Sequence, residues 1–275
     1  VSAFVDNVAT VLMIAPVGLA IAKKLKISPV PLLISISVSS NLQGAATLVG
    51  DTTSILLGGF ANMDFLDFFF LKGKPSIFWA VELGALATVP VIMFIFRNDK
   101  GAVSKSKLTR VDDYFPTYLL VANIVLLIAA SFIPGKPDVT NGVICLVLCV
   151  IGILRAVIKT GSFEIANNVL LDVDYNTLLL LGGLFVVIGG ITEAGVIEDL
   201  SRLFVRLGGD NLFLMYSLIV WGSVLISAFI DNIPYVATML PVVSGIAAIM
   251  GVSPYVLYFG LLSGATLGGN LSPIG

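Results

Sequence analysis

Long apolar segments interrupted by short polar motifs follow one another along this chain of 275 residues. About 20 mostly apolar residues suffice to cross a bilayer as a helix, so this length predicts membrane-spanning helices. The predicted continuous helices lie at about 8–24, 75–96, 114–134, 139–158, 175–195, 211–229 and 233–250. The segment 29–60 is predicted to be a helix broken near its middle. Residues 254–275 are predicted to form the beginning of a second broken helix. Residues 160–173 and 196–210 predict short helices at the membrane surface.

A polar hexapeptide within these apolar segments occurs twice, as SAFVDN at 2–7 and SAFIDN at 227–232, which gives an offset of 225 (227 − 2). Polar segments that are duplicated and interrupted by Gly and Pro are typical of the binding sites of repeat-built transporters. The same offset relates further residues: Pro16 to Pro241, Ser28-Pro29 to Ser253-Pro254, Leu42 and Gly44 to Leu267 and Gly269, and Gly50 to Gly275. The sequence therefore predicts one site made by two copies of a motif.

Each hexapeptide places an aspartate, Asp6 or Asp231, beside an asparagine, Asn7 or Asn232, in apolar surroundings. An ionised aspartate at mid-membrane costs about 2.5–3.5 kcal/mol on insertion scales, so it normally faces a wet cavity or a cation. A turn there also frees backbone carbonyls, and these oxygens with serine and amide oxygens suit Na⁺. Alternatively, a desolvated carboxyl group can hold a proton. The competing interpretation is that each aspartate caps the helix that follows it.

A glycine motif follows each hexapeptide at the same distance, since the spacing from Asp6 to Gly44 (44 − 6) equals that from Asp231 to Gly269 (269 − 231). Glycine lets the backbone approach a ligand closely and lets a helix break. A half-helix beginning near Thr52 would also offer its N–H groups to an anion. The alternative is close packing of membrane helices through small residues.

Three other acidic residues lie in or beside apolar segments. Asp51 is either a site residue or the cap of a half-helix, whereas Glu82 and Glu193 are expected near the membrane surface. Cys145 and Cys149, which share one helix face, are expected to be small packing residues.

Five predicted spans separate the two hexapeptides: the broken helix and those at 75–96, 114–134, 139–158 and 175–195. If each hexapeptide is the tip of a re-entrant hairpin, an odd number makes the two copies enter from opposite faces, as an inverted repeat. We therefore expect a first repeat at 1–96, a linker loop at 97–113 and a second repeat at 114–275. In this topology, ten of the lysine and arginine residues lie on the same side of the membrane as the linker loop and five lie on the other side. The positive-inside rule therefore places the linker loop in the cytoplasm.

Composition agrees with a membrane protein, since the mean hydropathy is +1.05 and only 12% of residues are charged. The net charge of −2 provides no basic field for nucleic acid. No catalytic, phosphate-binding or cofactor motif is evident, so we expect neither an enzyme nor a cofactor. The chain begins at Val1 within a motif, which indicates an internal part of a longer transporter.

The two hexapeptides and the stretch ATLVGD at 46–51 resemble motifs of the ion transporter superfamily. This superfamily includes arsenical pumps, NhaD-type sodium/proton antiporters, the melanosomal P protein and divalent anion/sodium symporters. The resemblance covers the whole chain. It implies an all-α integral membrane protein with two inverted repeats, each with a re-entrant helical hairpin and a broken transmembrane helix, in a homodimer. We expect it in the cell (inner) membrane.

The resemblance also implies where ions bind, with the substrate between the two tips. Candidate Na⁺ sites lie between each tip and its broken-helix loop, at Ser2, Asn7 and Gly44 and at Ser227, Asn232 and Gly269. The residues expected to bind the coupling ion or the substrate are Ser2, Asp6, Asn7, Gly44, Thr47, Asp51, Ser227, Asp231, Asn232, Gly269 and Asn270.

These features predict a secondary active transporter that moves a small ion by alternating access, coupled to a Na⁺ or H⁺ gradient. In dicarboxylate symporters of the superfamily, the motif at each tip is similar to Ser-Asn-Thr. The Asp-Asn at each tip of this chain therefore favours cation handling or proton coupling. The alternatives are a Na⁺-coupled transporter of a dicarboxylate or other organic anion, an arsenite or oxyanion transporter, and a passive ion channel on the same fold.

Overall fold

The computed structural model describes residues 1–98 and 113–272 of the chain. Twelve α-helices dominate these residues, which confirms the all-α prediction. The first four are α1 (Asn7–Leu25), α2 (Pro29–Gly44), α3 (Thr52–Phe60) and α4 (Ile77–Ile95). Between α3 and α4 lie the 3₁₀ turn η1 (Phe65–Phe68) and a hairpin of β1 (Phe70–Leu71) and β2 (Lys74–Pro75). The later helices are α5 (Phe115–Ser131), α6 (Thr140–Thr160), α7 (Glu164–Leu171), α8 (Tyr175–Glu193), α9 (Val196–Gly208), α10 (Leu212–Ser227), α11 (Asn232–Met250) and α12 (Tyr255–Gly268).

Five of the described helices are long and apolar enough to cross a membrane: α1, α4, α6, α8 and α11. Helices α9 and α10 meet the same test together but are bent by 117°, and α5 and α12 are shorter apolar helices. The predicted break in 29–60 is confirmed, because α2 ends at Gly44 and α3 begins at Thr52. Most of the predicted linker at 97–113 lies outside the described residues.

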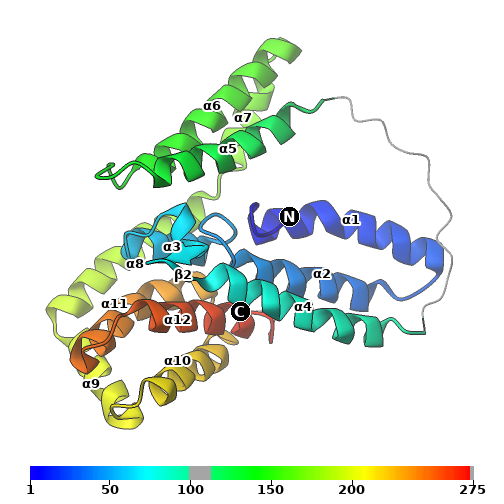
Figure 1. Cartoon of the computed structure of the whole chain (residues 1–275). Helices are drawn as coiled ribbons and strands as arrows, with labels where there is room; N and C mark the ends of the chain where they lie inside the picture. The colour runs from blue at the N-terminus through cyan, green and yellow to red at the C-terminus, as the bar shows by residue number, and fades with distance from the viewer. Residues whose placement is uncertain (99–112, 273–275) are drawn as a thin grey trace.

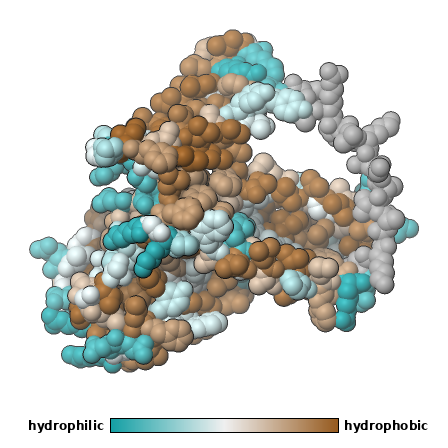
Figure 2. Space-filling view, viewed as in Figure 1, coloured by the Kyte–Doolittle hydropathy of each residue, from teal (hydrophilic) through white to brown (hydrophobic). Residues whose placement is uncertain are grey.

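Large apolar side chains cover much of the protein's outer surface (Figure 2). Leu83 and Leu86 on α4, Leu146 on α6 and Leu179 on α8 each expose 66–75% of their area. Neither α6 nor α8 contributes a fully buried residue. A surface of this kind is stable only against lipid or further protein, and with five candidate spans it identifies an integral membrane protein.

The helices form a main body and a separate arm (Figure 1). In the body, α1 packs on α2 and α2 on α4, while α11 packs on α3, α9 and α12. Helix α10 lies along α12, with the most extensive contact of any helix pair described. The arm is the pair α5 and α6, extended by α7, and α5 contacts the body at η1. The N-terminus lies near the middle of the body, at the start of the turn before α1 (Figure 1).

The helices that follow the two hexapeptides, α1 and α11, are related by the same sequence offset as the hexapeptides themselves. Helices α1 and α11 have the same length, 19 residues, and both their ends are displaced by the same 225 (232 − 7 and 250 − 25). Each helix ends at a left-handed residue, Lys26 with φ 54° and Gly251 with φ 63°. We call residues 2–50 the first copy and residues 227–275 the second copy.

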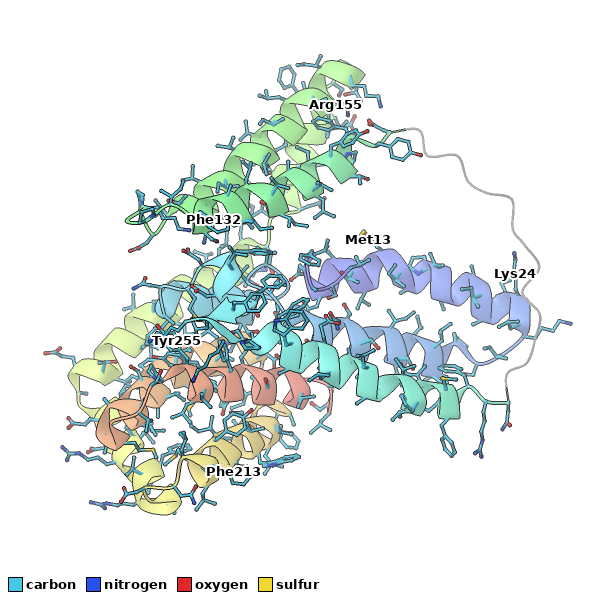
Figure 3. All side chains as sticks on the ribbon, in the orientation of Figure 1. Met13, Lys24, Phe132, Arg155, Phe213 and Tyr255 are labelled. Atoms are coloured by element: carbon cyan, nitrogen blue, oxygen red, sulfur yellow. The ribbon has the colours of Figure 1, made fainter. Side chains whose placement is uncertain are left out.

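The arm is closed at one end by an ion-pair cluster. Asp113 at the start of α5 pairs with Arg155 at 2.9 Å and Lys159 at 2.8 Å near the end of α6; Arg155 is labelled in Figure 3. Hydrogen bonds from these two cations hold the pKa of Asp113 well below its usual range. The Asp113 carboxylate therefore stays charged in all but strongly acidic solution, and the arm keeps this tie.

The two cysteines of α6 are both free thiols on its exposed surface. The prediction that they are packing residues is therefore wrong, although the Cys145 thiol donates to the Asn123 amide oxygen at 3.5 Å. Both the lipid-facing and the inward-facing sides of a membrane helix are apolar, so the sequence pattern did not identify the packed side of α6.

A second ion pair ties the arm to the body. Lys136, in the α5–α6 loop, binds Asp64 at 2.5 Å and donates to the Ala130 carbonyl at 3.1 Å. The Lys136 side chain is 12% exposed and that of Asp64 is 33% exposed, so the pair is partly screened from water.

Replacing Lys136 by alanine is expected to destabilise the protein by about 1–2 kcal/mol, between the values for surface and buried pairs, because it leaves Asp64 without its partner. Thermal unfolding of the purified protein in detergent measures this as a lower midpoint. The control is Arg202→Ala, since the Arg202–Glu198 pair is exposed on both sides. Equal midpoints for both variants would contradict a stabilising tie.

Candidate functional site

Each hexapeptide forms the turn that precedes a long helix. Asp6 accepts hydrogen bonds from the N–H groups of Val8 at 3.0 Å and Ala9 at 3.2 Å, and Asp231 accepts one from Ile233 at 2.8 Å. Both aspartates therefore cap a helix N-terminus, as the competing interpretation predicts. Capping leaves them accessible, since Asp231 is exposed and Asp6 half-buried. A cation or proton can still reach either carboxylate.

A serine hydroxyl fixes each tip to the next helix. Ser2 donates to the carbonyl of Ser40 in α2 at 2.7 Å, and Ser227 donates to the carbonyl of Ala265 in α12 at 3.0 Å. Donor and acceptor are both displaced by the offset of the hexapeptides (227 − 2 and 265 − 40), so the two bonds are the same bond in the two copies. Both serines are buried, with 4% and 0% exposure.

A second hydroxyl fixes each tip to the loop that follows the glycine motif. Thr47 donates to the carbonyl of Ala3, and Ser272 donates to the carbonyl of Ala228. Donor and acceptor are again related by the same offset (272 − 47 and 228 − 3). The offset of the sequence therefore recurs in the structure as a matching pair of hydrogen bonds.

Backbone carbonyls converge on Gly50 in the first copy. A Cβ placed on Gly50 would lie 2.5 Å from the Gly44 carbonyl oxygen, 3.0 Å from that of Ser2 and 3.1 Å from that of Ala3. Its φ lies outside the left-handed region, so glycine is required here for space and not for conformation. Its counterpart Gly275 lies outside the described residues. A set of carbonyls and hydroxyls this close forms a hard oxygen environment of the kind that small cations accept.

Asp51 caps the second half of the broken helix. Its carboxylate accepts from the Thr53 hydroxyl at 2.8 Å and, at 3.5 Å, from the Thr53 N–H, and the residue is 6% exposed. In the same first turn of α3, Ser54 donates to the Gly44 carbonyl at 3.3 Å, a hydrogen bond that joins α3 to the end of α2 across the break. Asp51 therefore has the geometry of a helix cap, and its role as a site residue stays a prediction.

A cavity of about 290 Å³ lies between the two copies. Helices α1 and α11 both begin at it, with Asn7 and Asn232, the first residue of each helix, in its wall. The described lining holds four asparagines and no charged side chain: Asn7, Val8, Val11, Leu12, Ser37, Asn41, Asn232, Gly269 and Asn270. Asp6 and Asp231 do not line it. The cavity thus has amide groups and two helix N-termini in its wall, together with the apolar side chains of Val8, Val11 and Leu12.

Asn41 joins the two copies across this cavity. Its amide NH₂ donates to the Thr266 carbonyl and to the Asn270 amide oxygen, both at 3.2 Å, and its oxygen accepts from Asn7 at 2.9 Å. Thr266 occupies the second-copy position equivalent to Asn41 (41 + 225 = 266). Equivalent positions of the two copies are therefore in contact, and the cavity forms where the copies meet.

Glycines of the second copy also serve helix packing. A Cβ on Gly264 would lie 2.5 Å from the Val220 carbonyl oxygen of α10, and one on Gly268 would lie 2.5 Å from that of Val224. Small residues therefore let α10 approach α12 closely. These two glycines therefore fit the alternative interpretation, close packing of membrane helices. Gly44 and Gly50 instead lie against the backbone of the helix break and of the first tip.

The structure brings the predicted residues together in two places. Asn7, Asn232, Gly269 and Asn270 line the cavity between the copies. The remaining predicted residues do not line the cavity but form the two tips and the break: Ser2, Asp6, Gly44, Thr47, Asp51, Ser227 and Asp231. Asn41, Ser37 and Ser40 were not predicted. Asn41 stands out in the sequence only as a polar interruption of an apolar helix.

The fold and the duplicated site are those of a repeat-built membrane protein of the transporter class. The chain matches the citrate transporter (CitMHS) family over residues 1–264 and belongs to that family. A family of transporters, and not of enzymes, is what the sequence indicated.

Curated relatives extend this assignment. An uncharacterized transporter of Mycobacterium tuberculosis is 34% identical over 277 residues, 99% of this chain and 63% of the relative. A 46 kDa membrane protein of Mycobacterium leprae is 34% identical over 279 residues, 100% of this chain and 64% of the relative. The human P protein is 24% identical over 353 residues, 100% of this chain and 42% of its own length. The chain spans about 63% of the mycobacterial relatives, and the similarity to the P protein confirms the superfamily resemblance.

Proposed function

We propose that the complete protein is a secondary transporter of a small carboxylate of the citrate type, driven by a cation that binds beside the two tips. One observation carries this proposal: the cavity between the copies is lined by four asparagine amides and by the N-termini of α1 and α11, with no acidic side chain among its described lining residues. The family's citrate description points to the same substrate class.

The lining suits an anion for two physical reasons. A helix N-terminus carries about half a positive elementary charge, and two such ends meet here, each with part of its N–H groups already donating to Asp6 or Asp231. Amide NH₂ groups add neutral donors that do not require a counter-ion. A volume of about 290 Å³ is small among ligand cavities, which favours a compact polyanion. This evidence favours the organic-anion alternative over transport of a cation as the main substrate.

The cation is proposed to bind where oxygens gather at each tip. In the first copy these are the Ser2 hydroxyl, the carbonyls around Gly50 and the Asp6 carboxylate. Na⁺ would use the hydroxyl and carbonyl oxygens, whereas a proton would use the aspartate. The two copies would be inverted repeats that alternate access to the cavity in a homodimer, with the 97–113 loop in the cytoplasm and the protein in the cell membrane.

Asp6→Asn and Asp231→Asn are expected to lower cation-coupled uptake at least about tenfold while the protein still folds. Asparagine caps a helix as well as aspartate does, so α1 and α11 keep their N-terminal bonds and lose only the charge. Uptake into proteoliposomes under imposed Na⁺ and pH gradients measures the change, with thermal unfolding as the folding control. Wild-type rates and unchanged ion dependence in both variants would reduce the aspartates to helix caps.

The acidic tips favour one competing function, cation/proton antiport without a carboxylate. The same vesicles separate the two functions. An antiporter moves Na⁺ against a pH gradient when no carboxylate is present, and the proposed transporter does not. A passive channel would instead conduct at rates that do not depend on a driving ion.

A further inference from the structure

A second cavity, of about 580 Å³ against about 290 Å³ for the site between the copies, lies elsewhere in the body. It is enclosed by the β1–β2 hairpin, the start of α4 and the facing helices α10 and α12. None of its described lining residues belongs to the site between the copies. The proposed transport function therefore leaves this cavity unexplained.

Ser76 places an unpaired polar group in the wall of this cavity. The residue is 9% exposed, and its hydroxyl has no hydrogen-bond partner among the described residues. Ser76 is the N-cap of α4, yet its side chain makes no capping bond. A buried hydroxyl normally has a partner, and the first turn of a 19-residue helix attracts negative charge. Both features fit an anionic ligand.

The charges of the cavity point the same way. Lys72 and Lys74 of the hairpin line it, and no acidic side chain does among the lining residues described. Lys72 lies over the ring of Tyr255, its Nζ 4.9 Å from the ring centre; Tyr255 is labelled in Figure 3. The cavity thus has two cations, an aromatic ring and an unpaired hydroxyl at one end.

The hairpin end of the cavity lies at the level of the membrane surface, and most of the remaining wall is apolar. Helix α4 is a candidate span that begins at Ile77, so the hairpin before it lies at the surface. Trp79, whose indole donates to the Phe69 carbonyl at 3.1 Å, adds an aromatic side chain typical of this level. Beyond the lysines the wall continues through Ile77, Val256 and Phe259.

A cationic end at the membrane surface joined to an apolar wall matches an amphipathic anion. We propose that this cavity binds an anionic phospholipid, with its phosphate at Lys72, Lys74 and Ser76. One acyl chain lies along the apolar wall. A soluble anion would leave the apolar wall in contact with water. A phospholipid explains both the cationic end and the apolar wall of the cavity.

The test is lipid retention by the complete protein. Protein purified from mixed micelles of phosphatidylglycerol and phosphatidylcholine is analysed by native mass spectrometry, which counts each bound lipid. Wild type is expected to retain phosphatidylglycerol selectively, and Lys72→Gln with Lys74→Gln to lower that retention about tenfold or more. Ser76→Ala removes an unpaired hydroxyl, so it is expected to weaken retention without lowering the unfolding temperature.

The matched control is Lys23→Gln with Lys24→Gln, an exposed lysine pair at the end of α1. It is expected to retain phosphatidylglycerol as wild type does. Equal retention of the two lipids, or equal losses in both double variants, would overturn the proposal. Displacement of the lipid by millimolar citrate or inorganic phosphate would assign the cavity to a soluble anion instead. The readout needs no transport, so its failure leaves the proposed function standing.

Discussion

Replacing Gly50 by alanine is expected to weaken cation-coupled uptake strongly, by lowering the affinity for the coupling cation. The added Cβ would lie 2.5 Å from the Gly44 carbonyl oxygen and about as close to the tip carbonyls, so these oxygens must separate. Overpacking of this kind costs about 1–3 kcal/mol, which as a loss of affinity for the coupling cation would be roughly 5- to 150-fold. The concentration of Na⁺ or H⁺ that half-saturates uptake measures the loss.

Gly59→Ala is the matched control for this change. Gly59 lies in α3, and a Cβ there would meet nothing within 4 Å, so alanine is expected to leave uptake unchanged and to stabilise the helix slightly. If Gly50→Ala transports normally with an unaltered cation requirement, the carbonyls around Gly50 do not form the coupling site. If it fails to fold, the Ser2→Ala variant tests the same oxygens without adding volume.

Asn7→Asp and Asn232→Asp are expected to raise the KM for a carboxylate substrate at least about 100-fold. Each change keeps the size of the side chain, replaces an amide donor by a negative charge and places that charge in the wall of the cavity. Like charges brought together in a binding site cost several kcal/mol. Initial uptake rates over a range of substrate concentrations measure KM.

The sign of this effect separates the candidate functions. A cation substrate would bind as well or better beside the new carboxylates, whereas an anion would bind worse. The control is Asn211→Asp, because Asn211 caps α10 through Phe213 and Leu214 away from the cavity. An unchanged or lower KM in the cavity variants would contradict an anion site.

The duplicated hexapeptide carried most of what the sequence could predict. Because a repeat fixes spacing and residue type together, the offset between the copies recurs in the structure, where both ends of α1 and α11 are displaced by the same number of residues. The broken helix followed from glycines and polar residues that a continuous apolar helix would not contain. The role of each aspartate stayed open at that stage, because a cap and an ion ligand require the same residue at the same place.

Other features depend on contacts that the pattern does not encode. Asn41 matters because it meets Thr266, which lies far away in the sequence, and no local spacing predicts that pairing. The β1–β2 hairpin has strands of two residues each, too short for an alternating pattern. The emphasis on cation handling came from the aspartates, but the structure places amides and not carboxylates in the cavity wall.

The most direct test of the account is uptake of radiolabelled citrate by proteoliposomes that contain the complete protein, under an imposed inward gradient of Na⁺ or H⁺. The account predicts saturable uptake that stops when the gradient is removed and that is lost in Asn7→Asp. Cation flux that needs no carboxylate, with no citrate uptake under either gradient, would contradict it.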